Sequence, residues 1–431
     1  MDICAEYAAL IDAITGRRWP DPVMACATSA CLDVVVDLAD ISRAPEIPPE
    51  AAPLIALLRD RAMRGVGGEI VHDWQGAVDW VRTQLPHDLA WGGTGPHAAM
   101  ALAALGARAL VALNDRSATT LSVIPDGVLM ACPSGLVARQ DMQPEGGLRN
   151  SVLIFEYTKD VPVLDGVIPP RSSRVIVRIG DLGIERDSSF HDLIATGRVQ
   201  VAAGLLGGFQ CVAQAELEQE FDRLRELSGR MRACGAAVIH LELAGYRRPE
   251  QVAHVLSSMR DAITSVGMSE SEFRFFFDCA PSAAPMRRIA ADFGLRRLCV
   301  HADRWTASVT QDDPAAERNA LMLGSLLAAT RAERGRAGLP RQVPDKAVLT
   351  PPDIGNSHAD DSGYAVAAVP TLYLNQPRTT LGMGDTFAAG CLLALSEADL
   401  SGPLAGQRGK EMDAVGQASE FGRHLQRRKT R

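Results

Sequence analysis

The feature that most limits the fold is the alternation of apolar, β-rich runs with amphipathic, helix-like segments along most of the chain. This alternation is typical of an α/β protein with a mainly parallel sheet. The expected strands cover 23–38, 108–113, 200–209, 236–243, 296–302 and 364–374. The expected helices cover 97–105, 213–233, 249–264, 315–334 and 385–398.

Two stretches interrupt this rhythm. Residues 42–90 open with "APEIPPEAAP" and include a charged helical segment, and residues 121–180 contain "SVLIFEYTKD" and "SSRVIVRIGD" on either side of a Pro-Pro turn. The second pair alternates as a hairpin does when one face of its sheet is open. We therefore expect a smaller, mostly β domain from 42–91 and 121–180. The large α/β domain then comprises 1–41, 92–120 and 181–431.

Composition narrows the class of protein. The 431 residues are 47% apolar, which is enough for a large domain with a smaller one beside it. The net charge of -8 is spread along the chain, so a nucleic-acid or anionic-membrane partner is not expected. Nine cysteines stand singly without a C-x-x-C pair, which favours thiols in a reducing compartment. No leader-like start or membrane-length apolar run is evident, so we expect a cytoplasmic protein.

The segment "LGMGD" places Gly382 and Gly384 directly ahead of Asp385 and an apolar helical run. Such glycines allow a tight turn whose amides converge at a helix N-terminus and bind an anion. Asp385 either caps the helix or acts as a base beside the anion hole. The second arrangement suits phosphoryl transfer, because the amides stabilise the moving group while the carboxylate accepts a proton.

The segment "WGGTGPHAAMALAALGA" allows three interpretations. Gly93, Gly95 and Ala98 have the G-x-G-x-x-A spacing of a dinucleotide-binding turn, but no apolar strand precedes them. Alternatively, Gly92 and Gly93 let the backbone approach a small polar ligand, or they form a plain helix-entry turn. The segment by itself leaves these alternatives open.

Further acidic residues lie within apolar segments of the sequence. Asp33 lies within "CLDVVVDL" and is either satisfied by neighbouring backbone or faces a site. His240 and Glu242 point to one face of a strand, either around a hydrated cation or as a polar surface pair. Glu272, in "SVGMSESEF", suits the dipole at a helix start.

Eight segments, in this order, resemble the ADP-dependent glucokinase and phosphofructokinase family, the branch of the ribokinase-like sugar kinases that uses ADP as donor. They are "CLDVVVD", similar to the family's N-x-D strand, "GGTGPHAAMALAALGA", "PPRSSRVIVRIGD", "GGFQ", "HLELA", similar to its H-x-E motif, "SVGMSESEF", "LCVHADRW" and "VPTLYLNQPRTTLGMGDTFAAG". The resemblance runs from about residue 23 to 398. It implies a Rossmann-like nucleotide-binding and catalytic domain, with the smaller domain as a β-rich lid over the sugar.

The resemblance also implies roles for individual residues. Asp385 would be the catalytic base, beside an anion hole formed by Gly382, Met383 and Gly384. The sugar contacts would be Asp33, Gly92 and Gly93, and a magnesium network would involve Glu242 and Glu272, assisted by His240. Arg174 would either bind a sugar phosphate or be solvated on its hairpin.

This chain departs from the family pattern at several positions. Ser269 replaces the asparagine of N-E-x-E, Leu32 replaces the asparagine before Asp33, and "PRSSR" stands for "PRANR". The serine side chain is shorter than that of asparagine and reaches less far toward the expected magnesium network. The phosphoryl donor could therefore be ADP or ATP. The loss of asparagine beside Asp33 leaves the identity of the sugar open.

The resulting hypothesis is a magnesium-dependent kinase that transfers a phosphoryl group from ADP or ATP to a hydroxyl of a sugar, sugar phosphate or sugar-like molecule. Its partners would be this small substrate and a nucleotide, and the protein would be a monomer or small homo-oligomer. The alternative is a catalytically degenerate kinase fold that binds sugar or nucleotide for regulation. A dinucleotide oxidoreductase would rest on Gly93, Gly95 and Ala98 alone.

Overall fold

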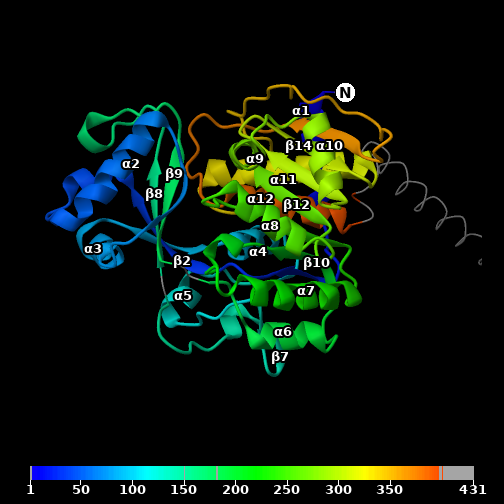
Figure 1. Ribbon diagram of the computed structural model, residues 1–431, viewed down its shortest axis with the longest axis horizontal. Helices are drawn as coiled ribbons and strands as arrows, with labels where there is room; N and C mark the ends of the chain where they lie inside the picture. The colour runs from blue at the N-terminus through cyan, green and yellow to red at the C-terminus, as the bar shows by residue number, and fades with distance from the viewer. Residues whose placement is uncertain (1, 150, 181–182, 398–399, 401–431) are drawn as a thin grey trace, which may run out of the picture.

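The computed structural model describes residues 2–149, 151–180, 183–397 and residue 400 (Figure 1). Within these residues, ten strands form the larger sheet, in the order β15-β14-β13-β12-β11-β10-β1-β5-β6-β7. The strands are β1 (Val23–Cys26), β5 (Ala109–Val111), β6 (Leu129–Cys132), β7 (Gly135–Ala138), β10 (Val201–Leu206), β11 (Val238–Glu242), β12 (Ser265–Ser269), β13 (Arg297–His301), β14 (Trp305–Thr310) and β15 (Ala365–Pro370).

The centre of this sheet is parallel. Every neighbouring pair from β13 across to β6 runs parallel, whereas β14, β15 and β7 are added antiparallel at the two edges. Parallel strands place their carboxyl ends at one edge of the sheet, where the connecting loops of open α/β folds form ligand sites. Glu242, Ser269 and His301 are the last residues of β11, β12 and β13.

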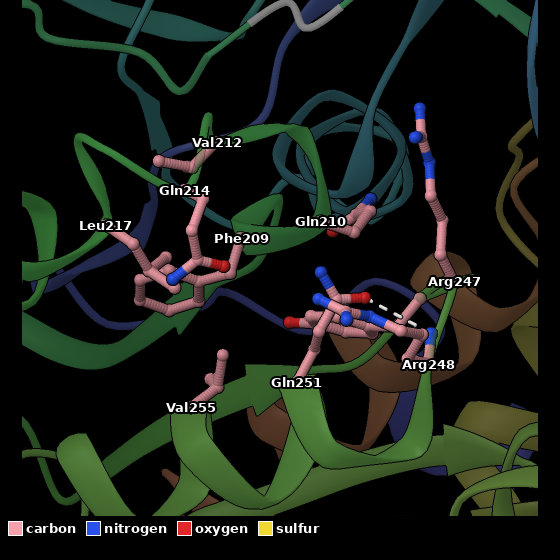
Figure 2. A pocket seen from close by; sticks show the side chains of 10 residues that line it. Phe209, Gln210, Val212, Gln214, Leu217, Arg247, Arg248, Gln251 and Val255 are labelled. Atoms are coloured by element: carbon pink, nitrogen blue, oxygen red, sulfur yellow. Dashed lines mark hydrogen bonds between the residues drawn. The ribbon is translucent and has the colours of Figure 1, made fainter.

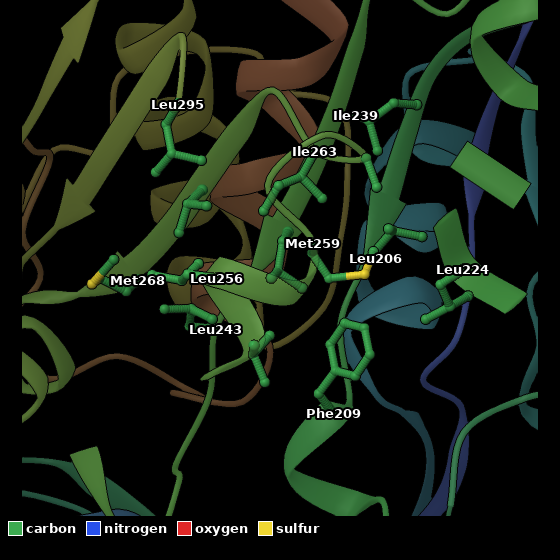
Figure 3. Close-up of a cluster of buried hydrophobic side chains, with 14 of the residues drawn as sticks. Leu206, Phe209, Leu224, Ile239, Leu243, Leu256, Met259, Ile263, Met268 and Leu295 are labelled. Atoms are coloured by element: carbon green, nitrogen blue, oxygen red, sulfur yellow. The ribbon is translucent and has the colours of Figure 1, made fainter. Parts of the chain in front are cut away.

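Helices cover both faces of the larger sheet, which explains its apolar strands. On β1, Val23 and Ala25 pack into one core and Met24 and Cys26 into the other. Figure 3 shows part of the first core, which includes Leu224 and Leu256 of two helices and Ile239 of the sheet. The helices of the larger domain are α1 (Ile3–Ile14), α4 (Thr94–Ala104), α5 (Ala118–Val123), α6 (Ser188–Ala195), α7 (Leu217–Ala233), α8 (Pro249–Ser258), α9 (Glu270–Phe277), α10 (Ala283–Asp292), α11 (Pro314–Arg334) and α12 (Met383–Leu395).

A second sheet forms the part drawn at the left of Figure 1. One of its faces is covered by α2 (Ala52–Arg64) and α3 (Ala77–Gln84), which share an apolar core with it. On the opposite face, Val152 and Ile154 pack with Leu381, the residue before Gly382. The strand order is β3 (Gly68–His72), β9 (Ser173–Ile179), β8 (Ser151–Tyr157), β2 (Cys31–Asp37) and β4 (Asp88–Gly92).

The sheets correct two of the expected domain boundaries. The run 23–38 forms two strands, because the chain turns at Thr28 (φ 80°) and β2 then pairs with β4 and β8 in the smaller sheet. Conversely, β6 and β7 belong to the larger sheet through the pairing of β6 with β5. Apolar spacing indicates that a strand is present, but its partner depends on the intervening turn. Residues 1, 181–182, 398–399 and 401–431, assigned to the large domain, lie outside the described residues.

Other expectations agree more closely with the structure. Strands β8 and β9 form the antiparallel pair expected around the Pro-Pro turn. The expected helices correspond to α4, α7, α8, α11 and α12, while α1, α5, α6, α10, β12 and β14 were not anticipated. Among the described residues, none of the helices combines the length and apolar character needed to cross a membrane.

Candidate active site

The glycine turn of "LGMGD" forms the start of α12. Gly382 is the N-cap residue in the left-handed region (φ 65°), and a Cβ there would overlap the ring of His97. Met383 is the first helical residue, and a Cβ on Gly384 would stand 3.0 Å from Cε1 of His301. Since the first amides of a helix lack intrahelical partners, this turn is suited to hold an anion.

Asp385 lies in the first turn of α12 and is half-buried. It does not occupy the cap position, which belongs to Gly382, so the interpretation of Asp385 as a helix cap is wrong. Burial and the nearby charge of Glu242 raise the pKa of Asp385, while Arg174 and a hydrogen bond from the Thr94 side chain oppose the rise. A carboxylate with a raised pKa beside a helix N-terminus is suited to accept a proton.

Asp33 lies on β2 and is only 2% exposed. A Cβ on Gly92, across the strand pair, would overlap its carboxylate, which explains that glycine. Cys31 Sγ donates to its Oδ1 at 3.3 Å, and His97 Nε2 lies 4.0 Å from its Oδ2. Burial raises the pKa of Asp33 to about 7, although Cys31 and Arg174 act in the opposite direction.

The surroundings of Gly93 do not fit a dinucleotide-binding turn. The preceding strand, β4, pairs antiparallel with β2 in the smaller sheet, whereas the turn requires a parallel βαβ unit. Gly93 itself (φ 102°) precedes α4, where a Cβ would stand 2.6 Å from the carbonyl oxygen of Ser29. Gly92 therefore leaves room for the Asp33 carboxylate, and Gly93 leaves room for the backbone at Ser29.

An acidic cluster lies at the carboxyl edge of the larger sheet, formed by His240, Glu242, Glu272 and His301. Glu242 accepts from His240 Nε2 at 2.9 Å through one oxygen and from His301 Nε2 at 3.0 Å through the other. Burial alone would raise the pKa of Glu242, but the two histidines hold it down to about 2. Burial lowers the pKa of His240, whereas Glu242 raises that of His301.

Glu272 belongs to the start of α9. Its Oε2 accepts from the Ser269 backbone N and from Ser269 Oγ, each at 2.7 Å, and Ser269 Oγ in turn accepts from the Glu272 N–H at 3.3 Å. Ser269 therefore closes a capping box. Burial raises the pKa of Glu272, against the effect of Ser269.

The acidic cluster does not form a metal cage. Among residues 2–149, 151–180, 183–397 and 400, no group of three or more His, Cys, Asp or Glu side chains is arranged to hold a metal ion. Mg²⁺ normally keeps several waters and binds one or two carboxylates together with substrate phosphates. Besides burial, the charge of Glu242 raises the pKa of both Asp385 and Glu272, so these carboxyl groups lie near one another.

A second group, the arginine cluster, comprises Asp33, His97, Arg174 and Arg331. Arg331, on α11, donates from Nε to the Leu381 carbonyl at 2.6 Å and from Nη2 to His97 Nδ1 at 3.0 Å. Arg174, on β9, lowers the pKa of both Asp33 and His97 through its charge. Nε of Arg174 and Nη1 of Arg331 are buried without a hydrogen-bond partner in the described part of the chain.

The smaller sheet directly contacts the segment that precedes α12. Glu156, on β8, accepts from Thr379 Oγ1 and from the Thr380 backbone N, each at 2.9 Å. These threonines come just before Leu381 and Gly382. Movement of the smaller sheet would therefore be transmitted to the anion-binding turn.

Sequence reasoning placed Asp385, Asp33, Glu242 and Arg174 in one site, and the structure brings them within electrostatic reach of one another. It did not select His97, Arg331 or His301. The signal for His97 was a polar residue within the apolar helix "GPHAAMALAA", whereas Arg331 stands in the charged stretch "TRAERGR", where nothing in the sequence distinguishes it.

A cavity of about 310 Å³ lies nearby, between the segments that follow β10 and β11. Figure 2 shows Arg248 and Gln251 at its wall, joined by a hydrogen bond of 3.1 Å from the Arg248 backbone N–H. Tyr246 and Phe209 also line it, but none of the predicted site residues does. The cavity is therefore separate from the two clusters.

A parallel α/β sheet, a glycine turn opening a helix with an aspartate in its first turn, and a β-rich second domain together define a ribokinase-like fold. Residues 22–394 match the family model described as the ADP-specific phosphofructokinase/glucokinase conserved region. The chain belongs to this family of ADP-dependent sugar kinases, and the resemblance inferred from the motifs is confirmed.

Individual relatives are distant in sequence. An ADP-dependent glucose/glucosamine kinase of Pyrococcus furiosus is 23% identical over 282 residues, which cover 56% of this chain and 60% of that protein. The match thus spans less than two thirds of this curated relative.

Solved structures support the fold. An ADP-dependent kinase in complex with fructose-6-phosphate and ADPβS superposes with a TM-score of 0.72 at 16% identity, covering 91% of this chain and 97% of its own. A hypothetical ADP-dependent phosphofructokinase from Pyrococcus horikoshii gives 0.66 at 18% identity, covering 88% and 99%. The predicted fold class is confirmed.

Proposed function

We propose that this protein is a magnesium-dependent kinase that transfers the terminal phosphoryl group of ADP to a hydroxyl of a sugar or sugar phosphate. The observation that carries the proposal is the position of Asp385 in the first turn of α12, directly beside the Gly382–Gly384 turn. This arrangement offers a base and an anion-binding helix end at one point, as in-line phosphoryl transfer requires.

In the proposed reaction, Asp385 accepts the proton of the attacking hydroxyl, and its raised pKa makes it a better base. The amides at the start of α12 stabilise the charge that develops on the phosphoryl oxygens. Mg²⁺ would lie near Glu242, Glu272 and Asp385, where it would neutralise phosphate charge. Glu242, fixed by its two histidines, keeps its negative charge throughout.

The smaller domain, formed around the β3-β9-β8-β2-β4 sheet, would act as a lid. Asp33 lies on this sheet and contributes to the acceptor site, together with the glycines opposite and Arg174. Closure of the lid excludes water that would otherwise receive the phosphoryl group. The contact of Glu156 with Thr379 and Thr380 links closure to the catalytic turn.

ADP is the proposed donor because the family is ADP-specific. The acceptors to be tested first are glucose, glucosamine and fructose 6-phosphate, which the names of the relatives contain. The spread negative charge and single cysteines support a cytoplasmic enzyme without nucleic-acid or membrane partners. We further propose that it works as a monomer or small homo-oligomer.

A phosphoryl-transfer panel tests the proposal. It crosses ADP, ATP and pyrophosphate with the three acceptors and further sugars, with and without Mg²⁺, and measures formation of the phosphorylated product. We expect turnover with ADP, an acceptor and Mg²⁺, and little with pyrophosphate. Stabilisation of the protein by ligand without any turnover across the panel would indicate a binding protein instead of a kinase.

A further inference from the structure

His97 and Asp33 face each other across the junction of the two sheets. His97 lies on α4 of the larger domain, and Asp33 lies on β2 of the smaller sheet. Their closest nitrogen and oxygen, Nε2 and Oδ2, are 4.0 Å apart, which is too far for a hydrogen bond. Both side chains are nearly buried, at 2% exposure each, so both polar atoms gain from a partner.

The position of the proton on His97 follows from Arg331. A guanidinium can only donate, so Nδ1 of His97 must accept the 3.0 Å hydrogen bond from Nη2. Burial and the charges of Arg331 and Arg174 lower the pKa of His97 well below its usual value, so the ring is neutral. A neutral ring with an unprotonated Nδ1 carries its proton on Nε2, which faces Asp33.

The ring is also fixed in place. Arg331 is itself anchored by its bond to the Leu381 carbonyl at 2.6 Å, and Gly382 lies against the face of the imidazole. His97 therefore has a set tautomer and a set orientation, held from α11 and from the catalytic turn. Such a preorganised donor loses little on binding a ligand.

We propose that His97 is a specificity-determining residue, whose Nε2–H and the Asp33 carboxylate together bind one hydroxyl of the acceptor. This inference rests on the proposed function. The hydroxyl oxygen would accept from His97 and, above the Asp33 pKa of about 7, would donate to the ionised Asp33 carboxylate. An oxygen about 2.8 Å from both atoms fits, because a 4.0 Å separation is shorter than two such bonds.

The chemistry of the pair defines the acceptor class. A hydroxyl can accept and donate at once, whereas an ether oxygen cannot donate, a methylene does neither and an ammonium cannot accept. A ligand lacking that hydroxyl leaves two buried polar groups unpaired, and sites built in this way discriminate strongly. We expect one monodeoxy analogue of the true acceptor to lose at least about 100-fold in kcat/KM.

The test compares wild type, His97→Phe and His97→Gln with D-glucose, fructose 6-phosphate and the monodeoxy analogues of each. Relative to wild type, His97→Phe should lower kcat/KM for the parent sugar by about 100-fold. For the one sensitive analogue, the variant and wild type should have the same kcat/KM. His97→Gln keeps an N–H at the end of the side chain and should retain most of the discrimination. The KM for ADP should not change in either variant.

A second pair of variants distinguishes loss of the hydroxyl contact from a general disturbance of the structure. Arg331→Met leaves His97 free to move its proton to Nδ1, so it should weaken the discrimination between parent and analogue. Arg334→Met removes an arginine of the same helix that bonds to the Leu339 carbonyl, and it should leave discrimination intact. Equal losses for parent and every analogue in His97→Phe would indicate a structural role only and overturn the proposal.

The same panel separates this inference from the kinase proposal. If wild type shows no turnover with any donor, the kinase proposal fails, and thermal stabilisation by the same sugars becomes the measurement. Stabilisation that disappears both for one deoxy analogue and in His97→Phe would still support the hydroxyl contact. Absence of any sugar-dependent stabilisation in a silent wild type would overturn both proposals.

Discussion

The acidic cluster and the arginine cluster differ in how many of their charged atoms have hydrogen-bond partners within the protein. In the acidic cluster, both oxygens of Glu242 and one oxygen of Glu272 are bound by protein donors. In the arginine cluster, Arg174 Nε and Arg331 Nη1 are buried without a partner among the described residues, and Asp33 stands 4.0 Å from His97. The first cluster satisfies most of its carboxylate oxygens with protein donors, whereas the second leaves donors and acceptors for a ligand to satisfy.

Asp385 lies between the two clusters, and the charges of both Glu242 and Arg174 act on its pKa. We predict that Asp385→Asn lowers kcat by about 100-fold or more, because an amide cannot accept the proton of the attacking hydroxyl. ADP affinity, measured by calorimetry, should remain near that of wild type. Asp292→Asn, an exposed acid at the end of α10, is the matched control and should be fully active. Wild-type turnover in Asp385→Asn would remove this residue from the mechanism.

Glu242→Gln tests whether the acidic cluster is complete in itself. The amide can accept from only one of the two histidines and turns its NH₂ group toward the other, so we predict a loss of about 10–100-fold in kcat together with lower stability. Denaturant unfolding at a series of pH values checks the cause.

The pH dependence of that stability has a definite sign. The pKa of Glu242 is depressed to about 2, so its contribution is fully present above the ordinary glutamate range and is lost as the pH falls toward 2. The difference in unfolding free energy between wild type and Glu242→Gln should therefore shrink as the pH drops from 6 to 3. A difference independent of pH would mean that the charge of Glu242 contributes nothing.

Part of the acidic cluster was visible in the sequence. His240 and Glu242 alternate on one strand, so they lie within a short motif that local geometry explains, whereas His301 comes from another strand and was not selected. His97 and Arg331 are 234 positions apart and meet only because α4 and α11 both pack near α12. A contact of that kind depends on tertiary packing, which a single sequence does not display.

The fold shows the same limit. The parallel core of the larger sheet followed from alternating apolar runs, but the transfer of β2 to the smaller sheet depended on the turn at Thr28. The short strands β12 and β14, with the sequences "SVGMS" and "WTASVT", are too rich in small polar residues to stand out. They are buried because each pairs with a strand on both sides and helices cover the faces of the sheet.

Asp33→Asn should show the opposite pH dependence to Glu242→Gln. The folded protein keeps the Asp33 proton up to about pH 7, whereas the unfolded chain loses it near 3.8, so burial of this carboxyl destabilises wild type progressively as the pH rises between those values. Asn carries no such penalty, so the variant should gain stability relative to wild type from pH 4 to pH 8, by a few degrees in Tm. A constant difference across this range would contradict the raised pKa.

The smallest expected effect concerns the support of the acidic cluster. Ser265 Oγ accepts from Arg297 Nη1 at 3.2 Å and lies 2.8 Å from His240 Nδ1, while Arg297 is held by Glu317. Because Arg297 can only donate, the hydroxyl proton of Ser265 is left to point at His240, which then presents its Nε2–H to Glu242.

Ser265→Ala removes this directional support, so His240 can turn or change tautomer and Glu242 loses part of its fixed geometry. We predict a loss of about 3–10-fold in the apparent affinity for Mg²⁺, at the lower end of what supporting residues of metal sites contribute. Ser308→Ala is the matched control, since Ser308 is also buried in the larger sheet and its hydroxyl has no partner among the described residues. If both variants lose affinity equally, the effect comes from packing of the sheet; if only Ser265→Ala does, the orientation of His240 sets the charge that Glu242 presents to the metal.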